Sequence, residues 1–254
     1  MFPLRDENPT LSTSVVTFLI IGLNTLAWIF VQGLGAPHTL ASSICQFGLI
    51  PGELLGTAAP GMRVPLGEGL FCVLQSGGSF FSVISSMFMH GGWFHIIGNM
   101  WFLAIFGDNV EDALGSVRFI LFYLLCGVSA AALQIFTAPG SLVPMVGASG
   151  AISGVMGAYA VLFPRSPVHV LIFLGFFITR IVVPAFFMLG YWFFLQLLGG
   201  IPALASTGGG VAFWAHVGGF VAGVILGKFL SIPERTASYR IRKGRMDRLL
   251  ERER

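Results

Sequence analysis

Charged residues are scarce in this sequence. They account for 10% of its 254 residues, whereas hydrophobic residues account for 55% and the mean hydropathy is +0.85. A soluble domain of average composition carries about 25% charged residues. The sequence therefore excludes an ordinary water-soluble domain and indicates an integral membrane protein, for which the lipid bilayer is the first partner.

Cysteine is also rare. Cys45, Cys72 and Cys126 match no metal-binding or redox spacing, and their odd number leaves at least one thiol unpaired. We therefore expect a function that does not rest on cysteine chemistry. Cys45 and Cys72 both fall in a long loop, where a disulfide and burial as separate thiols are both compatible with the sequence.

A strong net charge is missing as well. The formal charge is +3, and most of the basic residues lie in the last twenty or so positions. Nucleic-acid binding would require a larger basic surface with aromatic residues among the charges, and this segment offers only Tyr239. We interpret residues 231–254 as a basic cytoplasmic tail and expect no nucleic-acid partner.

Apolar runs separated by Gly, Pro or charged residues dominate the rest of the chain. They lie at residues 14–34, 92–106, 116–137, 148–163, 182–198 and 211–230. The first run is longer than the core of a signal peptide and is about the length that crosses a ~30 Å hydrocarbon layer. The sequence predicts an all-α polytopic membrane protein, a bundle of six transmembrane helices.

The six runs also define the domain organisation. We expect one membrane domain over residues 14–230, preceded by a short cytoplasmic segment at 1–13 and containing a long outer loop at 36–91. Residues 168–180 are assigned to the membrane interface. Only Arg63 of the fourteen Lys and Arg residues then lies on the outer side, so the positive-inside rule predicts cytoplasmic termini in a plasma or bacterial inner membrane.

Four polar residues gather at the outer ends of the second, fourth and sixth runs. His95 and Asn99 are four apart and share a helical face, Ser149 opens the fourth run, and His216 lies about five residues into the sixth. Polar residues inside membrane spans are costly and mark functional sites by default. We therefore expect these four side chains to converge in the outer leaflet.

Glycine spacing favours contact between the fourth and sixth runs. Gly150 follows Ser149 within a stripe of small residues, and His216 continues into Gly219 and Gly223. Small residues at this spacing let two helix backbones approach closely. The packing would bring the Ser149 hydroxyl within hydrogen-bond distance of the His216 imidazole, which is the arrangement of a nucleophile and its base.

Such a pair supports acyl transfer. A neutral imidazole can take the serine proton, and the free amides at a helix N-terminus, with Asn99 and His95 as further donors, can hold the developing oxyanion. No acidic residue occurs between Asp112 and Glu234, so no carboxylate is available behind His216. We expect a Ser149–His216 dyad instead of a triad.

The chain resembles the rhomboid family of intramembrane serine proteases over about residues 80–230. Three motifs carry the resemblance: His90-Gly-Gly-Trp-Phe-His95-Ile-Ile-Gly-Asn99, Gly147-Ala-Ser149-Gly150 and Ala215-His216-Val-Gly-Gly219. It implies a Ser149–His216 dyad, an oxyanion site of His95, Asn99 and the Ser149 amide, and substrates that are transmembrane proteins. It implies no cofactor, a structural role for Glu111, and substrate entry controlled by helix five and the loop before helix six.

Two positions depart from this pattern. Many relatives carry Trp-Arg where this chain has Phe81 and Ser82, and some carry a tyrosine against the catalytic histidine where this chain has Ser153. We therefore expect other packing, from Phe213 or Trp214, to orient His216. His90, Gly147, Gly150, Gly219 and Gly223 are expected to support the site structurally.

The sequence disfavours three other interpretations. His90 and His95 are five apart with no carboxylate beside them, which disfavours a metal site. A polytopic transporter would place its polar residues near the midplane and show an inverted repeat, neither of which is apparent. A non-proteolytic rhomboid-like protein that binds membrane proteins would lack Ser149 or His216. The sequence leaves the oligomeric state open.

Overall fold

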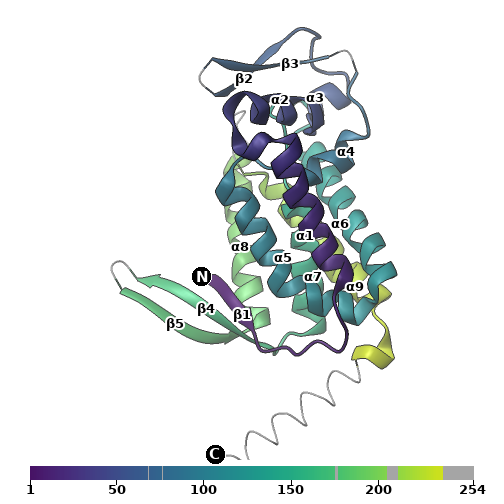
Figure 1. The fold of residues 1–254 in the computed structure, drawn as a ribbon, viewed down its shortest axis with the longest axis vertical. Helices are drawn as coiled ribbons and strands as arrows, with labels where there is room; N and C mark the ends of the chain where they lie inside the picture. The colour runs from purple at the N-terminus through teal and green to yellow at the C-terminus, as the bar shows by residue number, and fades with distance from the viewer. Residues whose placement is uncertain (68, 76, 175–176, 205–210, 237–254) are drawn as a thin grey trace, which may run out of the picture.

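Within the described residues, six helices form the body of the molecule (Figure 1). The computed structural model describes residues 1–67, 69–75, 77–174, 177–204 and 211–236. The helices are α1 (Val15–Leu26, continued by a π-helix at Ala27–Val31), α5 (Trp93–Leu114), α6 (Ser116–Thr137), α7 (Ser149–Leu162), α8 (Ala185–Ala203) and α9 (Phe213–Leu230). Within the described residues, α6, α8 and α9 are long and apolar enough to cross a membrane, and α1 and α7 are shorter apolar helices.

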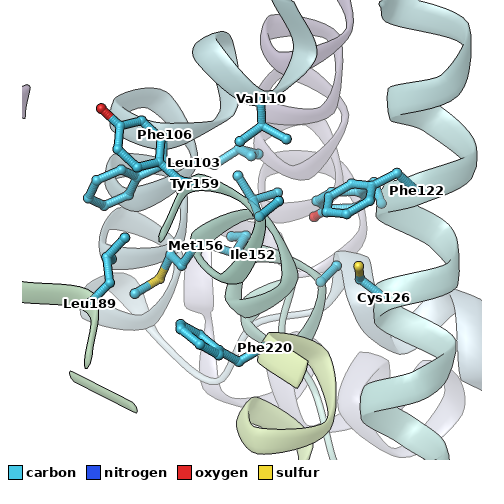
Figure 2. Close-up of a cluster of buried hydrophobic side chains, with 14 of the residues drawn as sticks. Leu103, Phe106, Val110, Phe122, Cys126, Ile152, Met156, Tyr159, Leu189 and Phe220 are labelled. Atoms are coloured by element: carbon cyan, nitrogen blue, oxygen red, sulfur yellow. The ribbon is translucent and has the colours of Figure 1, made fainter. Parts of the chain in front are cut away.

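Helix α7 lies at the centre of the bundle. All of its residues from Gly150 to Tyr159 are buried, as expected for a helix that is apolar or small on every face. Figure 2 shows Ile152, Met156 and Tyr159 of α7 among side chains from four other helices. These neighbours include Phe106 of α5, Phe122 and Cys126 of α6, Leu189 of α8 and Phe220 of α9. Its 14 residues extend about 21 Å at ~1.5 Å per residue, and the surrounding helices shield it.

Glycines bring α7 and α9 into backbone contact. A Cβ atom at Gly219 would lie 1.9 Å from the carbonyl oxygen of Gly150, and one at Gly223 would lie 1.9 Å from that of Gly154. Both distances are too short for any side chain. The relative position of α7 and α9 therefore depends on glycine at these positions.

A three-stranded antiparallel sheet lies at one end of the bundle, beside the N-terminus. It consists of β1 (Phe2–Asp6), β4 (Pro167–Leu174) and β5 (Phe177–Pro184), in the order β1-β4-β5. We refer to this end as the strand end (Figure 1). The all-α prediction missed this sheet. Val168 and Val170 are buried whereas His169 between them pairs with Glu7, which is the alternation of a strand.

Because of this sheet, two of the predicted element boundaries differ from the observed ones. The segment that we assigned to the interface without a secondary structure forms the β4–β5 hairpin, and helix five begins at Ala185, after Pro184, instead of at residue 182. The N-terminal segment is part of the fold, because β1 pairs with β4 from Phe2 to Asp6.

Helix α5 is longer than predicted. The expected end at residue 106 is wrong, because α5 continues to Leu114 and buries Glu111 and Asp112. The Glu111 carboxylate accepts hydrogen bonds from the Val16 and Thr17 amides at 3.0 and 2.7 Å. These are among the first amides of α1, which have no partner within their own helix. The buried acid therefore caps α1.

The opposite end of the bundle, the loop end, carries the long segment between α1 and α5. It contains α2 (Pro37–Phe47), α3 (Pro51–Leu54), the hairpin of β2 (Arg63–Gly67) and β3 (Leu70–Val73), and α4 (Ser82–Ser85), with short 3₁₀ turns at Gly33–Gly35 and Ser86–Phe88. A Cys45–Cys72 disulfide joins α2 to β3, which resolves the alternative that the sequence left open.

Backbone contacts attach this segment to the bundle. Leu49 and Met145 exchange two backbone hydrogen bonds of 2.9 and 2.8 Å, and the side chain of Gln32 bonds both the amide and the carbonyl of His90. Phe81, at the position where many relatives have tryptophan, is 64% exposed. The loop segment is therefore anchored without a Trp-Arg pair, and one of its anchors lies four residues before Ser149.

Candidate active site

The structure brings Ser149 and His216 together. Ser149 is the first residue of α7, and His216 lies in the first turn of α9. Their Oγ and Nε2 atoms are 2.8 Å apart, within hydrogen-bond distance. Both side chains are half-buried. Because the contacts of Gly219 and Gly223 fix α9 against α7, the packing of these two helices holds the Ser149 hydroxyl beside the His216 imidazole.

Gly147 shapes the approach to Ser149. Its φ is +127°, in the region that favours glycine. A Cβ atom there would lie 2.6 Å from the His95 Nε2 atom. The Gly147 amide donates to the carbonyl of Ser86 at 2.9 Å, which holds the turn in place. Glycine at position 147 therefore lets His95 lie directly beside the start of α7.

His95 and Asn99 offer hydrogen-bond donors at the same end. The Gly91 amide donates to His95 Nδ1 at 3.2 Å, so in a neutral ring the hydrogen is on Nε2, the atom that lies next to Gly147. Asn99 is 7% exposed, and its side-chain nitrogen has no partner among the described residues. The His90 ring packs edge-on against His95 at 5.2 Å. His95 Nε2 therefore lies beside the start of α7, and Asn99, one turn further along the same face of α5, carries a second donor group.

Helix α8 holds the His216 ring. Its Nδ1 atom is 2.8 Å from Gln196 Oε1, and the Trp192 ring lies 5.7 Å from the imidazole, centroid to centroid. The expectation that Phe213 or Trp214 orients His216 is therefore wrong: the Trp214 indole donates to the carbonyl of Gly200 at 3.0 Å, and Phe213 packs against Gly199.

Sequence reasoning missed Gln196. The signal was present, because Gln196 is the one side-chain amide in α8, a helix of otherwise apolar, aromatic and small residues. Which face of such a helix turns inward is not fixed by its hydrophobic pattern. In the loop before helix six, which the resemblance implies to control substrate entry, residues 205–210 lie outside the described residues.

A small cavity lies beside the serine. Its volume is about 20 Å³ and its walls include Met87, Gly127, Ala130, Met145 and Ser149. This is the space of about one water molecule or one small substituent. The site therefore has room next to the hydroxyl for a small group only.

A family model described as the Rhomboid domain matches residues 77–233, well over half of the chain. The matched segment contains every residue of the candidate site. The chain therefore belongs to the rhomboid family, whose members are polytopic membrane proteins.

Individual relatives support this assignment. The chain is 29% identical to Rhomboid protein 1, mitochondrial, of Saccharomyces cerevisiae over 59% of this chain and 42% of that protein. It is 32% identical to Rhomboid-like protein 11, chloroplastic, of Arabidopsis thaliana over 60% and 53%, and 29% identical to Rhomboid protease GluP of Bacillus subtilis over 63% and 28%. The matches thus cover about half or less of each relative.

These names also bear on localisation. Two of them assign their proteins to mitochondria and chloroplasts. The comparisons support a membrane protein and give no support to our expectation of a plasma or bacterial inner membrane.

Proposed function

We propose that this chain is an intramembrane serine endopeptidase that hydrolyses peptide bonds in or near the transmembrane segments of other membrane proteins. The observation that carries the proposal is the 2.8 Å approach of His216 Nε2 to Ser149 Oγ across two separate helices. Membership of a family with relatives named as proteases supports it. An inactive relative would lack the serine or the histidine, whereas this chain has both Ser149 and His216, in contact with each other.

The chemistry follows from the pair. His216 Nε2 takes the Ser149 proton while Oγ attacks the carbonyl carbon of the scissile peptide bond. The C–N bond then breaks, and the imidazolium returns the proton to the leaving amine. A water molecule, deprotonated by the same imidazole, hydrolyses the acyl-enzyme ester and restores the serine.

The developing oxyanion requires hydrogen-bond donors. We assign this role to the Ser149 amide at the start of α7, the Asn99 side chain and His95 Nε2. Removing one donor of this kind costs roughly 2.7 to 4 kcal/mol of transition-state stabilisation. Because Asn99 is buried and its amide nitrogen has no partner within the described part of the chain, it is available for this purpose.

The surroundings of the serine indicate the substrate class. The cavity of about 20 Å³ beside Ser149 accepts a small side chain next to the scissile bond. Apolar residues surround the site, so a transmembrane segment with small residues and weak helix propensity at one end fits it. We further propose that all six helices cross the bilayer, with the strand end and both termini on the cytoplasmic side.

The test is cleavage of a single-span model substrate by the purified full-length protein in proteoliposomes. We expect cleavage near the end of the span on the side of the loop end. Ser149→Ala is expected to abolish it, because no other hydroxyl approaches His216 in the described structure.

Ser153→Ala is the matched control. Ser153 lies one turn further along α7, and its hydroxyl donates to the Ser149 carbonyl at 2.6 Å instead of contacting His216. This variant should retain cleavage. Cleavage that persists in Ser149→Ala, or that never occurs with the wild-type protein, would refute the proposed function.

A further inference from the structure

We propose that Gln196 is a positioning residue of the site, whose side-chain amide holds His216 in the tautomer that accepts the Ser149 proton. The inference rests on the proposed function and extends it, because a dyad without a carboxylate still requires something to orient its base. Three consecutive hydrogen bonds across α8, α9 and α7 carry the argument.

The direction of each bond follows from the one before it. Gln196 Nε2 is 3.3 Å from the carbonyl oxygen of Trp192, one turn earlier in α8. A carbonyl oxygen only accepts, so the NH₂ group of the amide faces Trp192 and its oxygen faces His216. That oxygen is 2.8 Å from His216 Nδ1 and also only accepts, so Nδ1 carries the hydrogen.

The remaining ring nitrogen is then fixed. A neutral imidazole that carries its hydrogen on Nδ1 has a free lone pair on Nε2. This atom is 2.8 Å from Ser149 Oγ, so the serine hydroxyl donates and the histidine accepts. The backbone of α8 thus determines, through Gln196, which way the proton moves at Ser149.

The burial of Gln196 also points to this role. The residue is 9% exposed in a helix whose other inward residues are apolar. Burying an amide is unfavourable unless it is hydrogen-bonded, and leucine would fill similar space without that cost. Trp192 lies on the same face of α8 and packs against the same imidazole. Helix α8 thus restrains the ring both by packing and by a hydrogen bond.

This arrangement accounts for two absences. No acidic residue lies between Asp112 and Glu234, and Ser153 stands where some relatives have a tyrosine against the histidine. A neutral amide fixes the tautomer and the ring orientation without adding charge. Because Trp214 ties α9 to Gly200 of α8, the base is oriented when α8 is docked against α9.

The first test compares labelling rates of the full-length protein in detergent with a fluorophosphonate probe across pH. Gln196→Leu is expected to react about tenfold more slowly, since an ordinary hydrogen bond corresponds to a factor of this order. Gln134→Leu is the matched control: the Gln134 side chain accepts from the amide of Ala215, next to His216, and does not contact the imidazole. This control should keep the wild-type rate and pH profile.

Gln196→Glu separates positioning from packing. It keeps an acceptor for Nδ1, so it should react faster than Gln196→Leu, and its carboxylate favours the imidazolium, so the acidic limb of its pH profile should move to higher pH. If Gln196→Glu restored only the packing around His216, the acidic limb of its pH profile would match that of the wild type.

Nitrogen-15 NMR of labelled histidine provides a readout that does not depend on activity. We expect the wild-type His216 to carry its hydrogen on Nδ1. The inference fails if the hydrogen is on Nε2, or if folded Gln196→Leu matches the wild type in rate, pH profile and spectrum. Absence of Ser149 labelling in the wild type would instead refute the proposed function, and the NMR result would still decide the role of Gln196.

Discussion

The two ends of the bundle both bury polar side chains, and they satisfy them differently. At the strand end, Glu111 accepts bonds from two amides and from the hydroxyls of Thr17 and Ser116. At the loop end, the buried Asn99 nitrogen has no partner among the described residues. Buried polar groups are normally paired, and an unpaired one requires an explanation.

We propose that the two ends use buried polar groups for different purposes. Several polar groups of the strand end are bonded to distant parts of the chain, for example the Leu11 amide to the Asp112 carboxylate and the Asn109 side chain to the Asn8 carbonyl. They hold elements together. At the loop end, the Asn99 side-chain nitrogen is without a partner in the described part of the chain, which suits the proposed role as an oxyanion donor. Substitutions at the strand end should therefore reduce stability, and those at the loop end should reduce activity.

The largest effect is expected for Glu111→Ala. It leaves the buried amides of Val16 and Thr17 without an acceptor, at about 1–3 kcal/mol for each unsatisfied group. The melting temperature in detergent should fall clearly, while the labelling rate of the folded fraction stays the same. Glu111→Gln keeps one acceptor oxygen, so its melting temperature should lie between those of the wild type and Glu111→Ala. An unchanged melting temperature for Glu111→Ala would show that the acid does not cap α1.

Asn99→Ala should have the next largest effect. Loss of one oxyanion donor should lower the rate of substrate cleavage about 10²- to 10³-fold with little change in melting temperature. Asn109→Ala, in the same helix but bonded to Asn8 at the strand end, is the matched control and should show the reverse pattern. If both variants lose the same property, the two ends do not differ as described.

The smallest effect concerns Asp6, whose carboxyl is bonded to the Tyr159 hydroxyl. Burial raises the pKa of Asp6 to about 6, above its ordinary value, so the folded state favours the neutral form. Its contribution to stability is complete below about pH 4 and is lost as the pH rises through about 6. Between pH 5 and 7.5, the wild type should lose no more than about 2 kcal/mol relative to Asp6→Asn.

The comparison with Asp6→Asn isolates this carboxyl from the nearby Glu7–His169 pair, which both proteins share. Thermal unfolding of the two proteins over this pH range is the measurement. If the wild type instead lost stability relative to Asp6→Asn as the pH falls, the effect would have the wrong sign and would contradict the raised pKa of Asp6.

Local patterns in the sequence were sufficient to predict the approach of Ser149 to His216. Glycines at 219 and 223 let the backbone of α9 approach that of α7 closely. Ser149 is the first residue of α7, and His216 lies in the first turn of α9. Apolar length alone also gave the bounds of α6, Ser116–Thr137. Such features depend on neighbouring residues in the chain.

Features that depend on distant residues were not predictable in the same way. The β4–β5 hairpin consists largely of apolar residues, and the third strand of its sheet, β1, comes from the N-terminus. Glu111 extends α5 because its partners lie near Val16, about 95 residues away. Gln196 faces His216 because of the rotation of α8, which an all-round apolar sequence leaves undetermined.

Mapping a fluorophosphonate adduct by mass spectrometry tests most directly whether His216 activates Ser149. An adduct is expected on Ser149 of the wild-type protein, none on Ser153, and none on Ser149 in folded His216→Ala. An adduct on another serine, or equal labelling of Ser149 with and without the histidine, would contradict it.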